Sequence, residues 1–341
     1  MSCSGSDAGG LSARRLRQAE YLTVASIAAF VALLAGAALL TDSGQVLARL
    51  GSLEAAVIVG LLALSLVNYA ARALRWQLFS RQLGIAVPPA RGALYYVAGF
   101  AMTTTPGKLG EALRLWLIER CHGYEYRRLA PLLIGDRLSD MNAMLFLCLL
   151  GLLGFSGQLW TTLAAVAVLA PLSALFVRPR LLMIATAGLH RLLRRRHARA
   201  VAGLRRMLRL TARLFTARGF AVAMALSLAG WLAECSALYW LLHALGAPIT
   251  WLQAVFVFAF AMVAGAVTML PGGLGGVEAT LFALLLSLGT DPQTAFAATA
   301  VIRLTTLWFA VGLGFLALPF ALRLARRGGD EMRFATQGAR Q

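Results

Sequence analysis

The sequence predicts an all-α polytopic membrane protein with about six full spans and two Pro-Gly-broken, re-entrant helical hairpins in an inverted repeat. Three observations predict this fold class. Hydrophobic residues make up 60% of the 341 positions and charged residues only 13%, and several apolar runs reach the ~20 residues that cross a ~30 Å hydrocarbon core. A phrase containing Pro-Gly occurs twice inside apolar sequence. Arginine-rich segments flank the apolar runs so that all of them fall on one side of a membrane.

The apolar runs predict six spans, and their order defines the organisation of the chain. We expect the spans at 21–40, 53–79, 129–153, 159–177, 219–244 and 293–320. The corresponding domains are a cytoplasmic N-terminal tail (1–19), a transmembrane domain (20–325) with repeat halves at about 53–155 and 219–322, a basic cytoplasmic segment between them (178–218) and a cytoplasmic C-terminal tail (326–341). The basic segment holds twelve arginines and no acid. It is either an amphipathic helix on the cytoplasmic leaflet or a solvated loop that sets the topology.

Each half carries one copy of the Pro-Gly phrase. Pro106-Gly107-Lys108-Leu109-Gly110-Glu111 returns as Pro271-Gly272-Gly273-Leu274-Gly275-Gly276-Val277-Glu278. The first copy divides 93–118 into two arms of about a dozen residues, and neither arm could span a bilayer at ~1.5 Å per residue. We therefore expect a re-entrant hairpin there. The arms of 251–289 are longer, so this region is predicted to be either a second hairpin or two full spans.

The repeat extends beyond the phrase. Trp76 precedes Pro106 by 30 residues and Trp240 precedes Pro271 by 31, while Arg137 and Arg303 follow the same prolines by 31 and 32 residues. The spans that flank the two phrases are predicted to run in opposite directions. This combination indicates an inverted-topology repeat, an arrangement that supports alternating access in secondary transporters.

The broken helices are the candidate binding site. A helix that restarts after a Pro-Gly break points its free N–H groups into the bilayer and attracts anions, and Lys108 adds a full charge beside the first break. The candidate substrate-binding residues are Pro106, Gly107, Lys108, Gly110, Glu111, Arg114, Arg137, Pro271, Gly272, Gly273, Gly275, Gly276, Glu278 and Arg303. The glycines either bring a substrate close to the backbone or serve helix packing alone.

The charged residues inside apolar runs each allow two interpretations. Glu111 and Glu278 either cap the restarting helices or form ion pairs or proton sites, with Arg137 and Arg303 as candidate partners. Arg72 and Arg75 are predicted to snorkel to the cytoplasmic interface or to act within the membrane. Asp136 and Asp140 share a helical face, and Arg137 is spaced to pair with Asp140. A two-Asp metal site is the alternative, although nothing else supplies ligands at a suitable spacing.

Composition and motifs argue against other classes of protein. The net charge of +18 comes largely from arginines next to apolar runs, which points to topology and anionic lipid rather than to nucleic acid. No Walker A phrase, Gly-x-Ser-x-Gly or His-Glu-x-x-His occurs. The four histidines and four cysteines show no catalytic or metal-binding spacing. We therefore expect neither a catalytic residue, a metal nor a cofactor.

These motifs resemble the lysylphosphatidylglycerol synthase transmembrane family, also called flippase-like membrane proteins. The resemblance rests on Arg72-x-x-Arg75-Trp76, on the phrase from Pro106 to Arg114, on Asp136-Arg137-x-x-Asp140, and on the phrase from Leu270 to Glu278 followed by Arg303. It covers about 20 to 325. One branch of the family carries a soluble aminoacyl transferase domain after the membrane part. The 341 residues here contain none, so we do not expect aminoacylation of phosphatidylglycerol.

The resemblance implies a multi-pass protein of a bacterial or archaeal cytoplasmic membrane that moves lipids or lipid-linked molecules between leaflets. The expected partner is a membrane lipid with an anionic or phosphate-bearing headgroup, bound between the two breaks. The first break is expected to supply more of the anion attraction and the second more of the close packing. Two alternatives remain at this point: a membrane enzyme acting on a polyprenyl or isoprenoid lipid, and a scaffold that docks a lipid-modifying enzyme through 178–218.

Overall fold

The computed structural model describes residues 49–105, 109–155, 216–268 and 270–338, and the single positions 44, 167 and 214. This part of the chain is helical, with turns and short connections between the helices. In chain order the elements are α3 (Ala55–Gln82), α4 (Pro89–Ala98), η1 (Gly99–Met102), α5 (Leu109–His122), α6 (Tyr126–Gly151), η3 (Leu152–Gly154), α10 (Ala217–Ala244), α11 (Trp251–Val267), η4 (Pro271–Gly273), α12 (Gly276–Ser287), α13 (Pro292–Arg303), the π-helical η5 (Leu304–Trp308) and α14 (Phe309–Gly338).

Four helical segments are long and apolar enough to cross a membrane. They are Ala55–Gln82, Tyr126–Gly154, Arg218–Ala244 and Pro292–Arg327. They confirm the spans predicted at 53–79, 129–153, 219–244 and 293–320. The predicted spans 21–40 and 159–177 and nearly all of the basic segment 178–218 lie outside the described residues. The described residues thus form an all-helical structure with the several apolar helices of a multi-pass membrane protein.

The two halves repeat the same order of elements. The helices α3 and α10 each contain 28 residues, each is followed by a short helix, a break and a second short helix, and each half then continues into a long helix (α6, or α13 through α14). The end of the first long helix is the same in both copies. Gly84 and Gly246 follow the helix ends with φ values of 67° and 76°, a left-handed conformation that favours glycine.

Backbone hydrogen bonds confirm that these two turns are equivalent. The amide of Ile85 donates to the carbonyl of Ser80 and the amide of Ala247 donates to that of Leu242, both at 2.9 Å. This six-residue closure after a left-handed glycine is the Schellman motif of helix ends. The match sets α3 and α10 in a register of 162 residues, so that Ala55 corresponds to Ala217.

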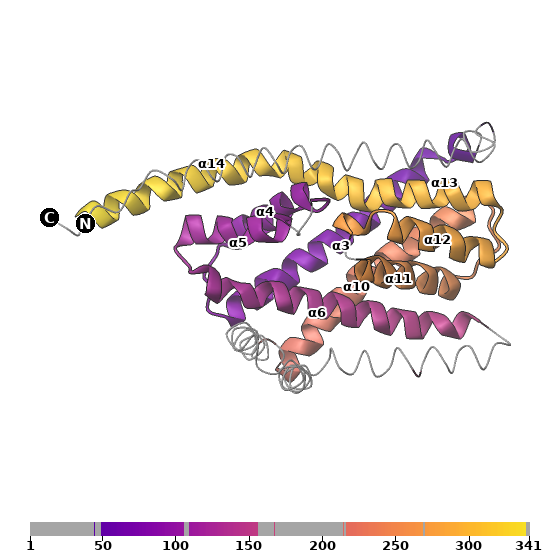
Figure 1. Ribbon diagram of the computed structural model, residues 1–341, viewed down its shortest axis with the longest axis horizontal. Coiled ribbons are helices and arrows are strands. Elements are labelled where there is room, and N and C mark those ends of the chain that lie inside the picture. The colour runs from indigo at the N-terminus through magenta and orange to yellow at the C-terminus, as the bar shows by residue number, and fades with distance from the viewer. Residues whose placement is uncertain are drawn as a thin grey trace, which may run out of the picture.

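The helices α3 and α10 pack against each other in opposite directions (Figure 1). Added Cβ atoms show the contacts: one at Gly60 would lie 2.1 Å from the Trp240 ring, and one at Gly230 would lie 3.3 Å from Cα of Asn68. Further along, Arg75 of α3 contacts Ser227 of α10. The residue number on α10 falls as the number on α3 rises, which defines an antiparallel pair that joins the two halves.

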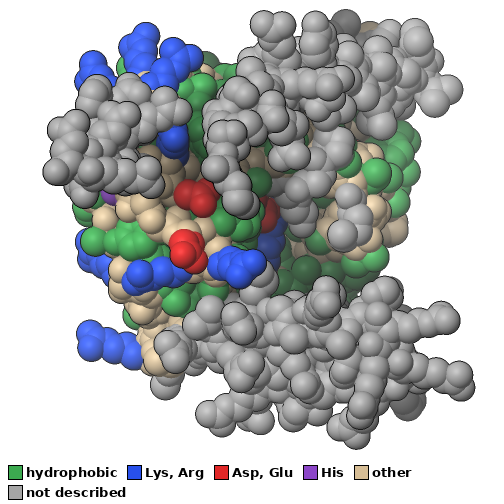
Figure 2. Space-filling view, turned by 60° about the vertical axis from the view of Figure 1, so that its left-hand side comes forward, with side chains coloured by type: hydrophobic (Ala, Val, Ile, Leu, Met, Phe, Trp, Pro, Cys, Tyr) green, Lys and Arg blue, Asp and Glu red, His purple; other side chains and the backbone are tan. Residues whose placement is uncertain are grey.

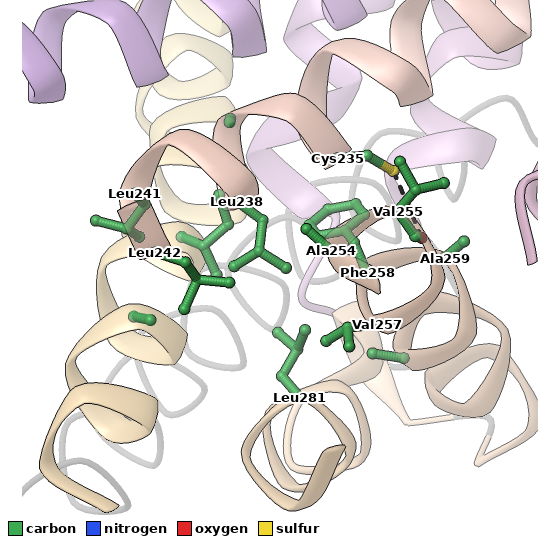
Figure 3. Packing of buried hydrophobic residues seen from close by; sticks show 14 of the residues in the cluster. Cys235, Leu238, Leu241, Leu242, Ala254, Val255, Val257, Phe258, Ala259 and Leu281 are labelled. Atoms are coloured by element: carbon green, nitrogen blue, oxygen red, sulfur yellow. Dashed lines mark hydrogen bonds between the residues drawn. The ribbon is translucent and has the colours of Figure 1, made fainter. Parts of the chain in front are cut away.

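Buried apolar side chains form two clusters, one mainly around each short-helix pair. One contains residues of α10, α11, α12 and α13 with parts of α3 and α6. Figure 3 shows the centre of this cluster, where Leu238 of α10, Phe258 of α11 and Leu281 of α12 lie close together. The other cluster contains residues of α3, α4, α5 and α14, including Trp76, Tyr96 and Leu117. The short helices that flank the two breaks therefore pack in separate cores.

Candidate functional site

The second Pro-Gly break is a turn made by three left-handed glycines. After Pro271 the backbone adopts φ values of 62° at Gly272, 69° at Gly273 and 82° at Gly275. Residues with a Cβ atom rarely adopt such values. A fourth glycine, Gly276, begins α12, where an added Cβ would lie 2.8 Å from the side chain of Thr268. The run of glycines therefore satisfies both the backbone turn and the packing of the helix that follows.

The carboxylate of Glu278 holds this turn together. Its Oε2 accepts a 2.7 Å hydrogen bond from the amide of Gly275, and its Oε1 accepts a 2.6 Å hydrogen bond from Nε of Arg303. The same arginine donates from Nη2 to the carbonyl of Gly272 at 3.0 Å. The Glu278 and Arg303 side chains are only 5% and 4% exposed. The capping role and the ion pair predicted for Glu278 are both confirmed, and one residue fulfils them together.

The first break has an equivalent ion pair in a more open position. Pro106, Gly107 and Lys108 lie outside the described residues, so the predicted charge of Lys108 in the pocket stays a prediction. Glu111, in the first turn of α5, forms an ion pair with Arg137 of α6, and their side chains are 17% and 49% exposed. The predicted pairing is confirmed, but it lies in a site far more exposed than that of Glu278.

The two arms of the first hairpin approach each other at glycines. A Cβ atom added at Gly110 would lie 2.2 Å from the carbonyl oxygen of Gly99. One turn further along α5, Arg114 is buried, with its guanidinium carbon 3.8 Å from the centre of the Tyr96 ring and its Nε donating to the Tyr96 carbonyl at 3.1 Å. The ring of Phe100 lies 5.2 Å away. Aromatic faces thus stabilise this cation, and Arg114 belongs to the packing between the arms.

A buried cluster of charges joins the first half to α10. Nε and Nη2 of Arg75 donate to Oδ1 of Asp136 at 3.1 and 2.5 Å, and its Nη1 donates to Oδ1 of Asp140 at 2.7 Å and to Oγ of Ser227 at 2.5 Å. Arg72 donates from Nη2 to Oδ2 of Asp140 at 3.1 Å. The Arg75 side chain has no exposed surface. Burial of this kind is tolerated only because every charge has a hydrogen-bonded partner.

This cluster corrects two predictions. Arg75 does not snorkel to the interface, because both aspartates of α6 hold it inside the protein. Arg137 does not pair with Asp140, since it pairs with Glu111 while Asp140 binds the two arginines of α3. The metal alternative also finds no support: in the described ranges, no group of three or more His, Cys, Asp or Glu side chains could hold a metal ion.

The grouping of Arg72, Arg75, Asp136 and Asp140 in one cluster was not predicted from the sequence. A usable signal was present, because an Arg-x-x-Arg pair on one apolar helix and an Asp-x-x-x-Asp pair on another each present two like charges on one face. Inside a membrane, a helix face with two arginines and a helix face with two aspartates can neutralise each other's charge. Trp231 of α10 completes the cluster with a 3.0 Å hydrogen bond from Nε1 to Oδ1 of Asp140.

The same contact recurs in the other half. Tyr69 occupies the position on α3 that Trp231 occupies on α10, and its hydroxyl donates to the carbonyl oxygen of Thr306 in η5. At the junction of the halves, Trp231 of the second half therefore bonds to the first half and Tyr69 of the first half bonds to the second. Figure 2 shows acidic and basic side chains beside one another on one face of the molecule, among hydrophobic side chains.

Comparison with known proteins agrees with this architecture. The family model described as the lysylphosphatidylglycerol synthase TM region matches residues 23–314. A UPF0104 membrane protein of Methanothermobacter thermautotrophicus is 25% identical over 313 residues, which cover 85% of this chain and 93% of the relative. A UPF0104 membrane protein of Pyrococcus horikoshii is 31% identical over 84 residues, a quarter of each chain. The chain belongs to the lysylphosphatidylglycerol synthase transmembrane-region family.

Proposed function

We propose that the protein moves lipids or lipid-linked molecules with an anionic headgroup between the leaflets of a bacterial or archaeal cytoplasmic membrane. The observation that carries this proposal is the difference between two equivalent ion pairs. Arg137 beside the first break is 49% exposed, whereas Arg303 beside the second is 4% exposed. An inverted-repeat transporter holds its two repeats in different conformations and exchanges them between its two states. An exposed ion pair in one repeat and a buried ion pair in the other fit one state of such a transporter.

The proposed topology places the two breaks within the membrane as re-entrant hairpins. The helices α5 and α12 contain 14 and 12 residues, so their lengths of about 21 and 18 Å are too short for a ~30 Å core. In Figure 1 the pair α4 and α5 lies toward one end of the molecule, and the pair α11 and α12 toward the other. With both termini in the cytoplasm, as the arginine-rich flanks favour, the hairpins would enter from opposite faces.

The open pair suggests how an anionic headgroup would bind. Arg137 is half exposed and offers a planar guanidinium to a phosphate, which can replace or share its bond to Glu111. In the alternate state, opening of the second hairpin would expose Arg303 in the same way. The lipid tails would remain in the bilayer throughout, so only the headgroup needs the polar path.

We infer a transporter rather than an enzyme, because the acidic residues of the site are committed to arginines. Asp136, Asp140 and Glu278 each accept hydrogen bonds from a guanidinium, and a carboxylate engaged in this way is poorly placed to exchange protons with a substrate. The isoprenoid-lipid enzyme and the scaffold stay predictions that no contact favours, and the segment on which the scaffold depends lies outside the described residues.

Purified protein in proteoliposomes tests the proposal. Fluorescent phosphatidylglycerol or fluorescent phosphatidylcholine is placed in one leaflet. Dithionite added outside quenches the fluorophores that reach the outer leaflet, so the decrease in fluorescence measures exchange. We expect the protein to accelerate exchange of phosphatidylglycerol, and Arg137→Gln to slow it about ten- to a hundred-fold, the range for losing one charged hydrogen bond to phosphate.

Arg127→Gln is the matched control, because Arg127 lies on the same helix, is exposed and lies outside the ion-pair cluster. Folded protein that moves neither lipid, or an equal loss in both variants, would contradict the proposal. Faster exchange of both lipids to the same extent would contradict the anionic headgroup but retain lipid movement.

A further inference from the structure

Glu234 of α10 is a buried acidic residue outside the ion pairs described above. Its exposed fraction is 5%. Among the described residues its carboxylate has no hydrogen-bonded or ion-pair partner. The other buried carboxylates of the junction are hydrogen-bonded to arginines. Glu234 therefore differs from them, because no guanidinium among the described residues is hydrogen-bonded to it.

The position of Glu234 relates it to Arg72. Arg72 lies 17 residues after the start of α3, and Glu234 lies 17 residues after the start of α10. These helices pack antiparallel and share the same terminal turn. The guanidinium of Arg72 lies over the ring of Trp231, 5.2 Å from its centroid, and Trp231 is three residues before Glu234 on α10. The repeat thus places an acid of one half about one helical turn from a residue that a cation of the other half contacts.

The groups that face Glu234 come from three of the four elements packed most closely against α10. Helix α3 contributes Tyr69 and Arg72, α6 contributes Asp140 and α13 contributes Arg303. Helix α11 contains no titratable residue, and the neighbouring thiol on α10 is that of Cys235. The charged groups around Glu234 therefore include one arginine of each half.

The charges around Glu234 are already balanced without it. Three arginines of the junction pair with three carboxylates: Arg72, Arg75 and Arg303 with Asp136, Asp140 and Glu278. Arg114 is enclosed by aromatic rings in the first hairpin. Among the described residues, an ionised Glu234 would add one uncompensated negative charge to a largely buried junction. Such a charge is costly unless a proton or a rearranged arginine neutralises it.

We propose that Glu234 is a proton-binding site that couples movement of the two halves to proton movement across the membrane. With the proton bound, Arg72 keeps Asp140 and Arg303 keeps Glu278, as observed here. When the proton leaves to water, the new carboxylate attracts one of these arginines and weakens its present ion pair. Release of Arg303 would free the second break, whereas release of Arg72 would loosen the contact between α3 and α6. The proton is thus the ion whose binding selects the state of the transporter.

Two measurements test the proposal. Proton binding by Glu234 can be tested alone, whereas its coupling to transport rests on the proposed function. The first is independent of lipid: infrared difference spectra of the reconstituted protein during a pH titration detect the C=O stretch of a protonated carboxyl group. We expect Glu234→Gln to remove one such band. The matched control Glu125→Gln should keep it, because Glu125 is exposed and makes no capping hydrogen bond.

The second measurement follows phosphatidylglycerol exchange in proteoliposomes with and without an imposed pH gradient. Wild-type exchange should respond to the gradient. Glu234→Gln stays in the neutral form, so its exchange should be slower and should not respond to the gradient. Glu234→Asp keeps the carboxyl group and should retain a shifted band, so it carries the test if the glutamine variant does not fold. A band unchanged in both Glu234 variants, or an equal gradient response in wild type and Glu234→Gln, would overturn the proposal. A Glu234 band without any lipid movement would support the proton site and contradict lipid transport.

Discussion

Arg75 and Asp136 are joined by two hydrogen bonds, from Nε at 3.1 Å and from Nη2 at 2.5 Å, where the arginine side chain is fully buried. The pair links α3 to α6, and Arg75 also reaches Ser227 on α10. Three helices from both halves thus meet at one guanidinium. The contact helps to fix the orientation of the two halves, so its loss should destabilise the whole fold.

Replacing Arg75 by leucine should strongly destabilise the protein. The change leaves Asp136 buried without its cation, a loss of about 3–5 kcal/mol in the free energy of unfolding. Denaturant unfolding in detergent micelles, followed by tryptophan fluorescence, would measure it. Arg127→Leu, at an exposed position of α6, should stay within about 0.5 kcal/mol of wild type. Equal stability of the two variants would show that the buried cluster is not structural.

The two equivalent glutamates should differ in their effect on stability. Glu278→Gln breaks a buried pair and weakens a cap, so we expect a loss of about 3 kcal/mol or more. Glu111→Gln breaks a half-exposed pair, for which about 1 kcal/mol or less is expected. Thermal unfolding of both variants under the same conditions gives the comparison. A larger loss for Glu111→Gln would contradict the assignment of open and closed breaks.

Two glycines of α14 should respond in opposite directions to alanine. A Cβ atom added at Gly314 would lie 2.1 Å from the backbone nitrogen of Ala101, so the helix must move away from η1 at a cost of about 1–3 kcal/mol. An added Cβ at Gly312 meets nothing within 4 Å. Gly312→Ala should therefore stabilise the helix by about 0.5–1 kcal/mol. Equal melting temperatures for the two variants would contradict the close approach at Gly314.

Asp291 should make stability depend on pH at the start of α13. Its Oδ1 accepts a 2.9 Å hydrogen bond from the amide of Thr294. Partial burial acts to raise the pKa of Asp291, but the bonds to Thr294 outweigh this and hold the pKa below its usual value of 3.8. The cap therefore contributes its full stability above the ordinary pKa, and this contribution is lost as the pH falls through the lower, folded-state pKa.

Asp291→Ala should therefore lower the free energy of unfolding by about 1 kcal/mol at neutral pH, the usual value of an N-cap. The difference from wild type should vanish in acid. Unfolding of both proteins across a pH series checks this, with Glu125→Gln as the control because Glu125 precedes α6 without a side-chain cap. A difference that persists in acid would show that the effect is not due to the charged cap.

The spans and the two glutamate–arginine pairs could be predicted from the sequence. Apolar length is enough to find a membrane helix, and the distance from proline to arginine is nearly the same in both halves, 31 residues from Pro106 to Arg137 and 32 from Pro271 to Arg303. Trp76 and Trp240 are not equivalent positions of the repeat, because the register set by the Gly84 and Gly246 turns makes Trp76 equivalent to Leu238. One apolar side chain can replace another on a membrane helix, whereas the left-handed turn requires glycine.

The Arg75 cluster could not be derived from the sequence because it depends on which helix faces lie together. Spacing within α6 allowed Arg137 to reach Asp140, and only the packing of α3 against α6 shows that Arg75 is closer. Glu234 posed the opposite difficulty. Its significance lies in having no hydrogen-bonded partner within the described residues, and no sequence pattern records that.

The antiparallel contact between α3 and α10 has the form of a homodimer interface in which both subunits have been fused into one chain. In a true homodimer, a residue beside the symmetry axis faces its own copy, so an ion pair of unlike residues cannot form there. Fusion removes that restriction. One position of the repeat can therefore carry Arg72 in one copy and Glu234 in the other, so that the two halves place unlike charges near their axis.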